Sequence, residues 1–213
     1  APEKQSPVRV ELHLTTEQQA ATRAMDENCI RDVNLYLYGD TEYHFYFPSV
    51  SSPLVFNVLP GNYRSYAIAN AGQDLGDKNA FKIQFYETAV DVMESSDAIP
   101  MTDRGTLAVD GAGRCTPSSL RVTRSAAKIA YTIEVADAVA PSLRLRSVQF
   151  CNLPLTIRPF DSGSISSTVE ANYYDGEAMP VGNERRTAGT AYLFENLQGS
   201  VDTITDQKDK CPE

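Results

Sequence analysis

The chain has 213 residues, of which 42% are hydrophobic and 22% are charged, and its formal net charge at pH 7 is −9. This composition is typical of a folded globular protein, and no apolar run approaches the ~18 residues that a membrane-spanning helix requires. The acidic balance, with lysine and arginine scattered along the chain, argues against nucleic acid as a partner, because phosphate binding needs a basic surface.

Hydrophobic residues alternate with polar ones in residues 8–15, which predicts a β-strand with one apolar face. That face carries Val8, Val10, Leu12 and Leu14. A small, polar stretch follows and leads to Arg23. We therefore expect an opening strand and then an exposed tether, the kind of segment that a protease reaches easily.

The strand pattern continues through residues 33–38, 42–47, 54–59 and 63–69. Pro60-Gly61-Asn62 separates the last two segments and is typical of a tight turn, so we expect a hairpin there. The first two segments form an aromatic-rich hairpin that includes Tyr36, Tyr38 and Tyr46. Exposed tyrosines stack on sugar rings, whereas paired strands turn about half of such residues into the core, and the sequence leaves both alternatives open.

Residues 77–92 change to near-helical spacing, with Phe81, Phe85, Ala89 and Val92 on one side and Asp77 placed to cap the first turn. We predict one short helix here. Asp74, Asp77 and Asn79 supply oxygen atoms of the kind that calcium prefers. They lack the spacing and the final glutamate of an EF-hand, so a capping loop is the favoured interpretation.

Residues 119–135 form the longest predicted strand, and residues 143–155 form another. Strands about every ten residues, with Gly and Pro turns and one helix, indicate a β-sandwich. Residues 161–190 are rich in Gly, Ser and Asn and predict a loop, and residues 191–199 predict one more strand. We expect a sandwich over residues 1–162, and a linker with the first strand or strands of an incomplete second β-domain over residues 163–213.

No catalytic motif stands out. The two histidines, His13 and His44, lie inside predicted strands, and the sequence contains neither a GxSxG nucleophile turn nor a phosphate loop. We therefore expect no enzyme activity, no cofactor and no metal. The four cysteines are Cys29, Cys115, Cys151 and Cys211. Their spacing fits neither a CxxC pair nor a zinc site, and two disulfides or free thiols are both compatible with it.

Several stretches together resemble the Bacteroidales fimbrillin family, the subunits of type V pili. They are VRVELHLTTEQQAATRAMDENCIRDVNLYLYG, LPGNYRSYAIANAG, LRVTRSAAKIAYTIEV and AYLFENLQG. The resemblance implies a fold of two tandem transthyretin-like, Greek-key β-sandwiches. It also implies export as a lipoprotein to the outer membrane, through a lipid anchor that is not part of this chain.

The resemblance further implies assembly by strand exchange, in which an arginine-specific protease removes the first strand and a donor strand from another subunit replaces it. By position, residues 8–15 are the exchangeable strand, Arg23 is the cleavage residue and Ala24 the new N-terminus. Arg31 is the second candidate, although its closeness to the next strand makes it less accessible. A lost strand leaves open backbone hydrogen bonds and an apolar groove, which is a template for β-augmentation.

The implied function is a fimbrial subunit or an accessory or tip adhesin at the cell surface. Its implied partners are other fimbrial subunits, and host or bacterial surface glycans or proteins. Asp202-Thr203-Ile204 is similar to a short O-glycosylation sequence of exported Bacteroidota proteins, which marks Thr203. The alternative function is a cell-surface glycan-binding lipoprotein that uses the aromatic hairpin.

Overall fold

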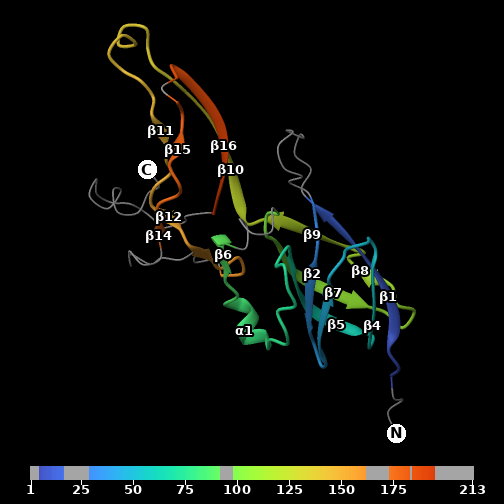
Figure 1. The fold of residues 1–213 in the computed structure, drawn as a ribbon. Coiled ribbons are helices and arrows are strands. Elements are labelled where there is room, and N and C mark those ends of the chain that lie inside the picture. The colour runs from blue at the N-terminus through green and yellow to red at the C-terminus, as the bar shows by residue number, and fades with distance from the viewer. Residues whose placement is uncertain (1–4, 17–28, 92–97, 162–172, 183, 195–213) are drawn as a thin grey trace, which may run out of the picture. The chain divides into compact units, whose positions relative to one another are not determined.

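The computed structural model of the chain describes residues 5–16, 29–91, 98–161, 173–182 and 184–194 (Figure 1). Contacts group the chain into two compact units, Ala1–Ser125 with Arg158–Asp161, and Ala126–Ile157 with Ser162–Glu213. The sequence predicted a domain boundary after residue 162. A grouping by contacts does not test whether the segments on either side fold independently, so this boundary stays a prediction.

Strands make up most of the described secondary structure, as the alternating sequence predicted. The elements in chain order are β1 (Val8–Thr16), β2 (Val33–Tyr38), β3 (Glu42–Phe47), β4 (Leu54–Val58), β5 (Gly61–Ala69), α1 (Ala80–Gln84), β6 (Thr88–Ala89), β7 (Met101–Val109), β8 (Cys115–Thr116), β9 (Ser119–Arg124), β10 (Ala126–Glu134), β11 (Ser147–Val148), β12 (Leu153–Pro154), β13 (Thr156–Ile157), β14 (Tyr173–Tyr174), β15 (Met179–Pro180) and β16 (Arg186–Phe194).

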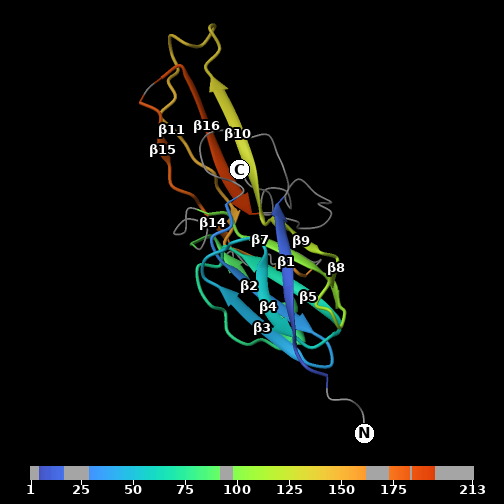
Figure 2. The ribbon, with the colours of Figure 1, turned by 90° about the vertical axis from the view of Figure 1, so that its right-hand side faces the viewer.

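The first unit is built on a strongly curved sheet with the strand order β3-β2-β5-β7-β9-β1-β4, in which β8 pairs with β7 (Figure 2). Strand β9 joins the two parts of this path, β3-β2-β5-β7 and β1-β4, because Thr123 and Arg124 pair with β7 while Ser119–Val122 pair with β1. The curved sheet thus folds over itself into a nearly closed, sandwich-like arrangement. The predicted fold class, mainly β with one short helix, is confirmed.

The hairpin expected at Pro60-Gly61-Asn62 is not present. Strands β4 and β5 both form, but β4 pairs antiparallel with β1, and β5 lies between β2 and β7. The turn therefore carries the chain from one side of the sandwich to the other. Pro and Gly show that the chain reverses direction, but they do not decide which strand it then pairs with.

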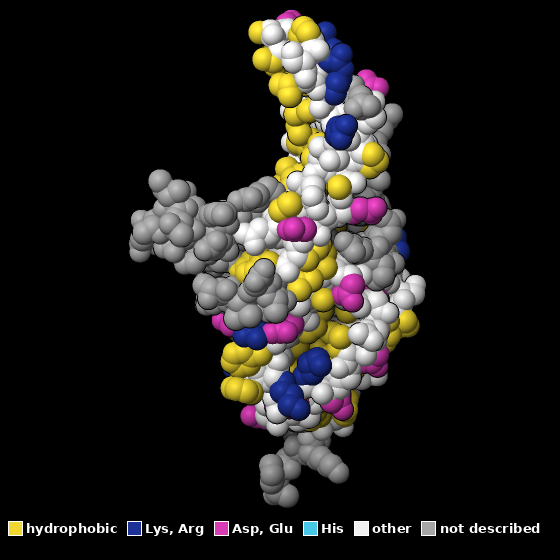
Figure 3. Space-filling view, turned by 60° about the vertical axis from the view of Figure 1, so that its left-hand side comes forward, with side chains coloured by type: hydrophobic (Ala, Val, Ile, Leu, Met, Phe, Trp, Pro, Cys, Tyr) yellow, Lys and Arg dark blue, Asp and Glu magenta, His cyan; other side chains and the backbone are white. Residues whose placement is uncertain are grey.

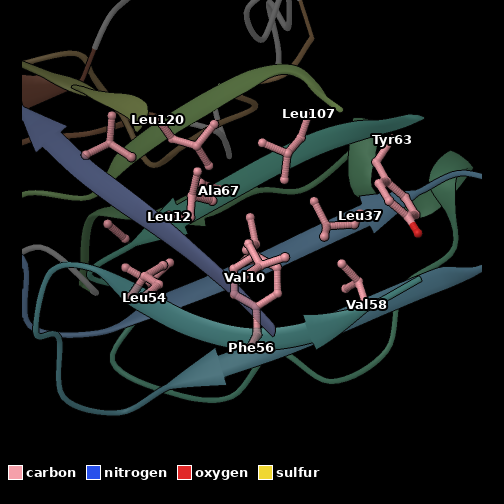
Figure 4. Close-up of a cluster of buried hydrophobic side chains, with 14 of the residues drawn as sticks. Val10, Leu12, Leu37, Leu54, Phe56, Val58, Tyr63, Ala67, Leu107 and Leu120 are labelled. Atoms are coloured by element: carbon pink, nitrogen blue, oxygen red, sulfur yellow. The ribbon is translucent and has the colours of Figure 1, made fainter. Parts of the chain in front are cut away.

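The main core lies between the two sides of the sandwich (Figure 4). Val10 and Leu12 of β1 point into it together with Leu54 and Phe56 of β4, and they meet side chains from β2, β5 and β7. The fully buried members include Val10, Leu12, Val33, Leu35, Leu37, Val58, Ala67, Ala69, Met101, Leu107 and Val122. Burial of this apolar surface is the main contribution to the stability of the unit.

A second apolar cluster lies on the other face of β2. Tyr36 and Tyr38 belong to it, with Tyr66, Ile68, Ala71, Ile83, Tyr86 and Phe160. Its cover is the segment that follows β5 and includes α1. The Arg104 guanidinium also donates to the Phe160 carbonyl oxygen over 2.8 Å, which ties residues 158–161 to the same unit.

The helix is shorter than predicted and is capped by a different residue. Asn79, not Asp77, caps α1, since its Oδ1 accepts from the Lys82 N–H over 2.8 Å. The buried residue of α1 is Ile83, whereas Phe81 and Phe85 are 70% and 45% exposed and their rings pack on each other at 5.0 Å. The near-helical spacing of the phenylalanines therefore marks the outer side of a single turn of helix.

The second unit contains the antiparallel pair β10 and β16, in register from Ala126 with Phe194 to Glu134 with Arg186. Short pairs β11–β15 and β12–β14 accompany it. Three sequence predictions change here, the first being the strand expected over residues 143–155, which contains only the two-residue strands β11 and β12. The long strand over residues 119–135 divides at Ser125, whose N–H donates to the Pro100 carbonyl over 2.8 Å, and β16 begins within the stretch expected to be a loop.

Large hydrophobic side chains also reach the surface, in several separate places on the face drawn in Figure 3. Over the described chain the most exposed are Val55, Phe81, Phe85, Ile129, Ile133, Val139 and Leu143. Scattered exposed apolar residues are normal for folded proteins and by themselves indicate no site. None of the described helices is long and apolar enough to cross a membrane.

Candidate functional site

The strongest candidate site is the slot that β1 occupies in the first unit. The predicted alternation is present, because Val10 and Leu12 are completely buried and Val8 and Leu14 are partly buried against the same core (Figure 4). The residues between them face outward and are exposed. The alternation of hydrophobic and polar residues thus predicted the inward face of β1 correctly. The role of these residues in strand exchange stays a prediction.

Strand β1 changes partners along its length. Val8–Leu12 pair antiparallel with Val58–Leu54 of β4, whereas His13–Thr16 pair in parallel with Ser119–Val122 of β9. Among the described strands, β4 pairs only with β1. The slot is therefore bounded by β4 along its first half and by β9 along its second half.

The turn after β7 comes very close to the backbone of β1. Gly113 has a φ of +79°, and a Cβ atom there would lie 2.1 Å from the Arg9 carbonyl oxygen. Asp110 holds the turn, because its carboxylate accepts from the Ala112 and Arg114 N–H groups, each over 2.9 Å. These bonds, with the Arg114 guanidinium, also lower the pKa of Asp110. Glycine at this position lets the turn lie against the backbone of β1 at Arg9.

The outward face of β1 lines a shallow groove opposite this turn, with Arg9, Glu11 and His13 on one side and Arg114 and Cys115 on the other. Arg9 and Glu11 form an exposed ion pair of 3.1 Å. Burial raises the pKa of the Cys115 thiol, which therefore stays protonated at neutral pH. Cys115 and Cys29 are free thiols, and no disulfide links either of them to Cys151.

Several predicted residues lie outside the described part of the chain. They are Arg23, Ala24, Thr203 and Cys211. The cleavage site and the glycosylation site therefore stay predictions.

The aromatic hairpin does form, since β2 and β3 pair antiparallel from Val33 with Phe47 to Tyr38 with Glu42. Its tyrosines, however, are not an exposed platform. Tyr36 is 0% exposed and Tyr38 4%, and their hydroxyl groups donate to the carbonyl oxygens of Gly76 (2.8 Å) and Lys78 (2.5 Å). Tyr46 is half-buried. Of the two alternatives that the sequence left open, Tyr36 and Tyr38 show burial, because the segment after β5 covers the face that carries them, and their contact with a glycan stays a prediction.

His44 belongs to this covered face as well. Its ring stacks on that of Tyr36, with 4.3 Å between centroids and 13° between planes. Nε2 lies 3.0 Å from Asn34 Oδ1, and the carboxylates of Asp74 and Asp77 lie 3.7 and 3.6 Å from the two ring nitrogens. Burial lowers the pKa of His44, while the two carboxylates act in the opposite direction. These contacts make His44 part of the packing of this face.

The loop considered for calcium has a structural role. Asp74 accepts from the Gly76 N–H over 2.8 Å, and Asn79 caps the helix. Over the described residues, no group of three or more His, Cys, Asp or Glu side chains is arranged to hold a metal ion. The capping-loop interpretation accounts for these side chains, with Asn79 as the cap.

Sequence reasoning missed a buried polar network that connects β2 to the segment after β5. Asp32 accepts from the Ala71 and Gly72 N–H groups over 3.1 and 3.0 Å, and burial raises its pKa despite these bonds. Asn34, completely buried inside β2, donates to the Gln73 carbonyl and accepts from the Leu75 N–H, each over 3.0 Å.

Asn70 completes this network with a side chain that is 1% exposed. A sequence pattern could have indicated the covered face. Asp32, Asn34, Tyr36 and Tyr38 alternate with aliphatic residues, and each carries a polar atom that can bond a covering backbone. A solvent-exposed strand face would more commonly carry lysine, glutamate or threonine.

No family model and no curated protein matches the sequence. Solved structures do match the fold, although their sequences are distant. The chain is similar to a Parabacteroides distasonis ATCC 8503 protein provisionally named a cell adhesion protein, with a TM-score of 0.65 and 12% identity over 94% of this chain and 73% of that one.

Two other matching structures are of proteins named as pilus proteins. A fimbrial assembly protein from the same organism matches with a TM-score of 0.53 and 13% identity, over 89% of this chain and 77% of that one. A fimbrilin from Porphyromonas gingivalis W83 matches with a TM-score of 0.58 and 13% identity, over 91% of this chain and 67% of that one. The fold is therefore that of fimbrillin-like β-proteins, which confirms the resemblance at the level of fold.

Proposed function

We propose that this protein is a non-enzymatic fimbrial subunit, or an accessory or tip adhesin, at the surface of a bacterial cell, and that it assembles by exchange of β1. The names of the matched proteins, fimbrilin, fimbrial assembly protein and cell adhesion protein, support the class. Attachment to the outer membrane through a lipid anchor is a further part of the proposal that rests on the family resemblance.

The position of β1 between β4 and β9 is the observation that best supports the proposed strand exchange. If β1 left, β4 would lose the one strand that it pairs with among the described residues, and Ser119–Val122 of β9 would lose its partner. The same step would open the places that Val10 and Leu12 fill at 0% exposure. An unpaired backbone beside an apolar groove is the surface that β-augmentation uses.

The slot also defines the strand that would replace β1. A replacement needs apolar residues at alternate positions, because a slip of one residue would turn its polar face into the core. Two completely buried side chains contribute about 1.5–3 kcal/mol each, so β1 should remain bound after its tether is cut. A donor strand that supplies larger apolar side chains, or more of them, would displace it.

The glycan-binding alternative finds little support. Two of the three tyrosines on which it depended are buried, and Tyr46 alone remains partly accessible. A surface of stacking aromatic rings would require the segment after β5 to leave β2, which would break the bonds of Tyr36 and Tyr38 to that segment.

The test uses this chain's own first strand as the probe. The protein is cut after Arg23 with an arginine-specific protease, the released segment is removed under mild denaturant, and uptake of a labelled peptide of residues 6–16 is followed by fluorescence anisotropy. Two variant peptides serve as a matched pair, Leu12→Asp on the buried face and Glu11→Ala on the exposed face. The uncut protein, whose slot is occupied, is the negative control.

We expect the peptide to bind the cut protein, and Leu12→Asp to weaken binding by about a hundredfold or more, because it places a charge in an apolar site. Glu11→Ala should bind within about threefold of the unchanged peptide, because its side chain faces solvent. Failure of the cut protein to take up the peptide, or equal binding of the two variants, would contradict the exchange mechanism.

A further inference from the structure

The side chain of Asn70 bonds directly to the segment that precedes β2. Asn70, at the end of β5, has a left-handed backbone with a φ of 62°. Its Oδ1 accepts from the Arg31 N–H over 2.8 Å, and its Nδ2 donates to the carbonyl oxygens of Cys29 (2.9 Å) and Ile99 (2.8 Å). A buried amide with all three bonds made is a rigid connection between three parts of the chain.

The backbone of Asn70 and the side chain of Asp32 strengthen the same connection. The Asn70 N–H donates to the Asp32 carbonyl oxygen over 3.0 Å. The Asp32 carboxylate, 5% exposed, accepts from the next two N–H groups along the chain, those of Ala71 and Gly72. Residues 29–32 and residues 70–72 are therefore joined at consecutive positions, although neither segment is a strand there.

These contacts surround one peptide bond, Arg31–Asp32. The side chain of Arg31 is exposed, so an arginine-specific protease could recognise it. The protease, however, needs its substrate extended and free to form main-chain hydrogen bonds, much as an added strand does. The Cys29 carbonyl, the Arg31 N–H and the Asp32 carbonyl are all engaged by Asn70, and the side chain that follows the bond is buried.

We propose that Asn70 is a positioning residue that shields the Arg31–Asp32 bond from cleavage and so confines processing to the tether before Cys29. The inference rests on the proposed function, in which an arginine-specific protease releases β1. By this proposal, Asn70 determines which arginine of this chain the protease cuts. The exposed arginine nearest β2 is protected by its backbone contacts, and a cut before Cys29 leaves all the bonds of Asn70 intact.

The test compares Asn70→Gly with Asn152→Gly in the full chain. Glycine keeps the left-handed backbone at position 70 while removing the amide. Asn152, with a φ of 59°, takes the same change at a distant left-handed position in the second unit. Both proteins and the unchanged protein are digested with an arginine-specific protease, and each cut is followed by intact mass and N-terminal sequencing. Amide exchange of Arg31 is measured alongside.

We expect Asn70→Gly to accelerate the cut after Arg31 by about tenfold or more, because proteolysis follows the population of the open segment and the lost bonds raise that population. The Arg31 N–H should lose protection by a similar factor, and Asn152→Gly should change neither. Arg64 serves as a reporter of global unfolding, since it is exposed yet lies within the fully paired β5.

Two outcomes would overturn the proposal: a cut after Arg31 that is no faster in Asn70→Gly than in the unchanged protein, or equal acceleration at Arg64. The last would show that Asn70 supports the whole fold rather than this segment. If the proposed function is wrong, the cut after Arg23 or the uptake of the peptide will be missing. The rates of the cut after Arg31 in the two proteins can still be compared in that case.

Discussion

Strands β1 and β2 have similar alternating sequences but are held very differently. Strand β1 buries one face, exposes the other, and pairs with β4 over one half and β9 over the other. Strand β2 is buried at all six positions and pairs along its whole length with β3 on one side and β5 on the other. A strand with one buried face and one partner per segment can leave a fold at far lower cost than a strand enclosed on every side.

The comparison extends to the second face of each strand. Arg9 and Glu11 on β1 pair with each other in solvent, whereas Tyr36 and Tyr38 on β2 reach into a second apolar cluster and bond a covering backbone. The first arrangement adds little to stability, and the second anchors the strand. The proposed exchange of β1 depends on this difference between the two strands, and four measurements test it.

The largest effect is expected for Tyr36→Ala. Removing a completely buried ring with its hydroxyl bond should lower the free energy of unfolding by about 3–5 kcal/mol, measured by urea denaturation. Phe81→Ala, which removes a ring that is 70% exposed, is the matched control and should stay within about 0.5 kcal/mol of the unchanged protein. A loss below 1 kcal/mol for Tyr36→Ala would mean that the second face of β2 is not a core.

Gly113→Ala should have the next largest effect. The added Cβ meets the Arg9 carbonyl, and the positive φ is unfavourable for alanine, so we expect a loss of about 1–3 kcal/mol. Gly111→Ala in the same turn has open space at its Cβ and should change stability by less than about 0.5 kcal/mol. Equal behaviour of the two variants would show that the turn does not press on β1.

The pH dependence of stability should reveal the burial of His44. Burial lowers its pKa in the folded state, so the unfolded chain binds the proton more readily. The stability that the neutral ring contributes is present above the ordinary histidine value and is lost as pH falls from about 7 towards about 5. Asp74, Asp77, Lys78 and Tyr36 are the titratable groups that face this ring.

Urea denaturation of the unchanged protein and of His44→Gln over this pH range isolates the contribution of His44. We expect the unchanged protein to lose more stability than the variant as the pH falls. If the two pH curves run parallel, the ring is protonated equally in both states and the cover over β2 is open to water.

The smallest effect is expected for Arg9→Ala, on the outward face of β1. It breaks an exposed ion pair, which is worth little, so the change in the free energy of unfolding should stay within about 0.5 kcal/mol. Together with Tyr36→Ala it compares the second faces of the two strands directly. A loss of several kcal/mol would show that the outer groove contributes to retaining β1.

The sequence predicted local features well and pairing poorly. The alternation at Val8, Val10, Leu12 and Leu14 predicted the inward face of β1, since a strand places alternate residues on opposite sides. The chain does leave β4 just before Pro60, but Gly61 and Asn62 already belong to β5, and no hairpin forms because β4 joins β1 and β5 joins β2 and β7. Pairing between segments far apart in the chain leaves no mark on a local pattern.

For the candidate site too, the sequence predicted the local feature but not the contacts between distant segments. The strand that fills the slot was visible in the sequence, whereas the boundary of the slot depends on β4 and β9, which are distant from it along the chain. Asn70 was not singled out, because a lone asparagine after a strand is common and its three bonds reach Cys29, Arg31 and Ile99 only once the fold forms.

By itself, the sequence determined that most strands of the first unit are present and which face of β1 is apolar, because these features depend on residues close together along the chain. Only the tertiary structure decided that Tyr36 and Tyr38 are covered, that the segment over residues 119–135 is two strands, and that Asn70 bonds to the residues before β2. Each of these depends on which distant segment comes to lie against a given face, and burial and pairing are properties of that contact.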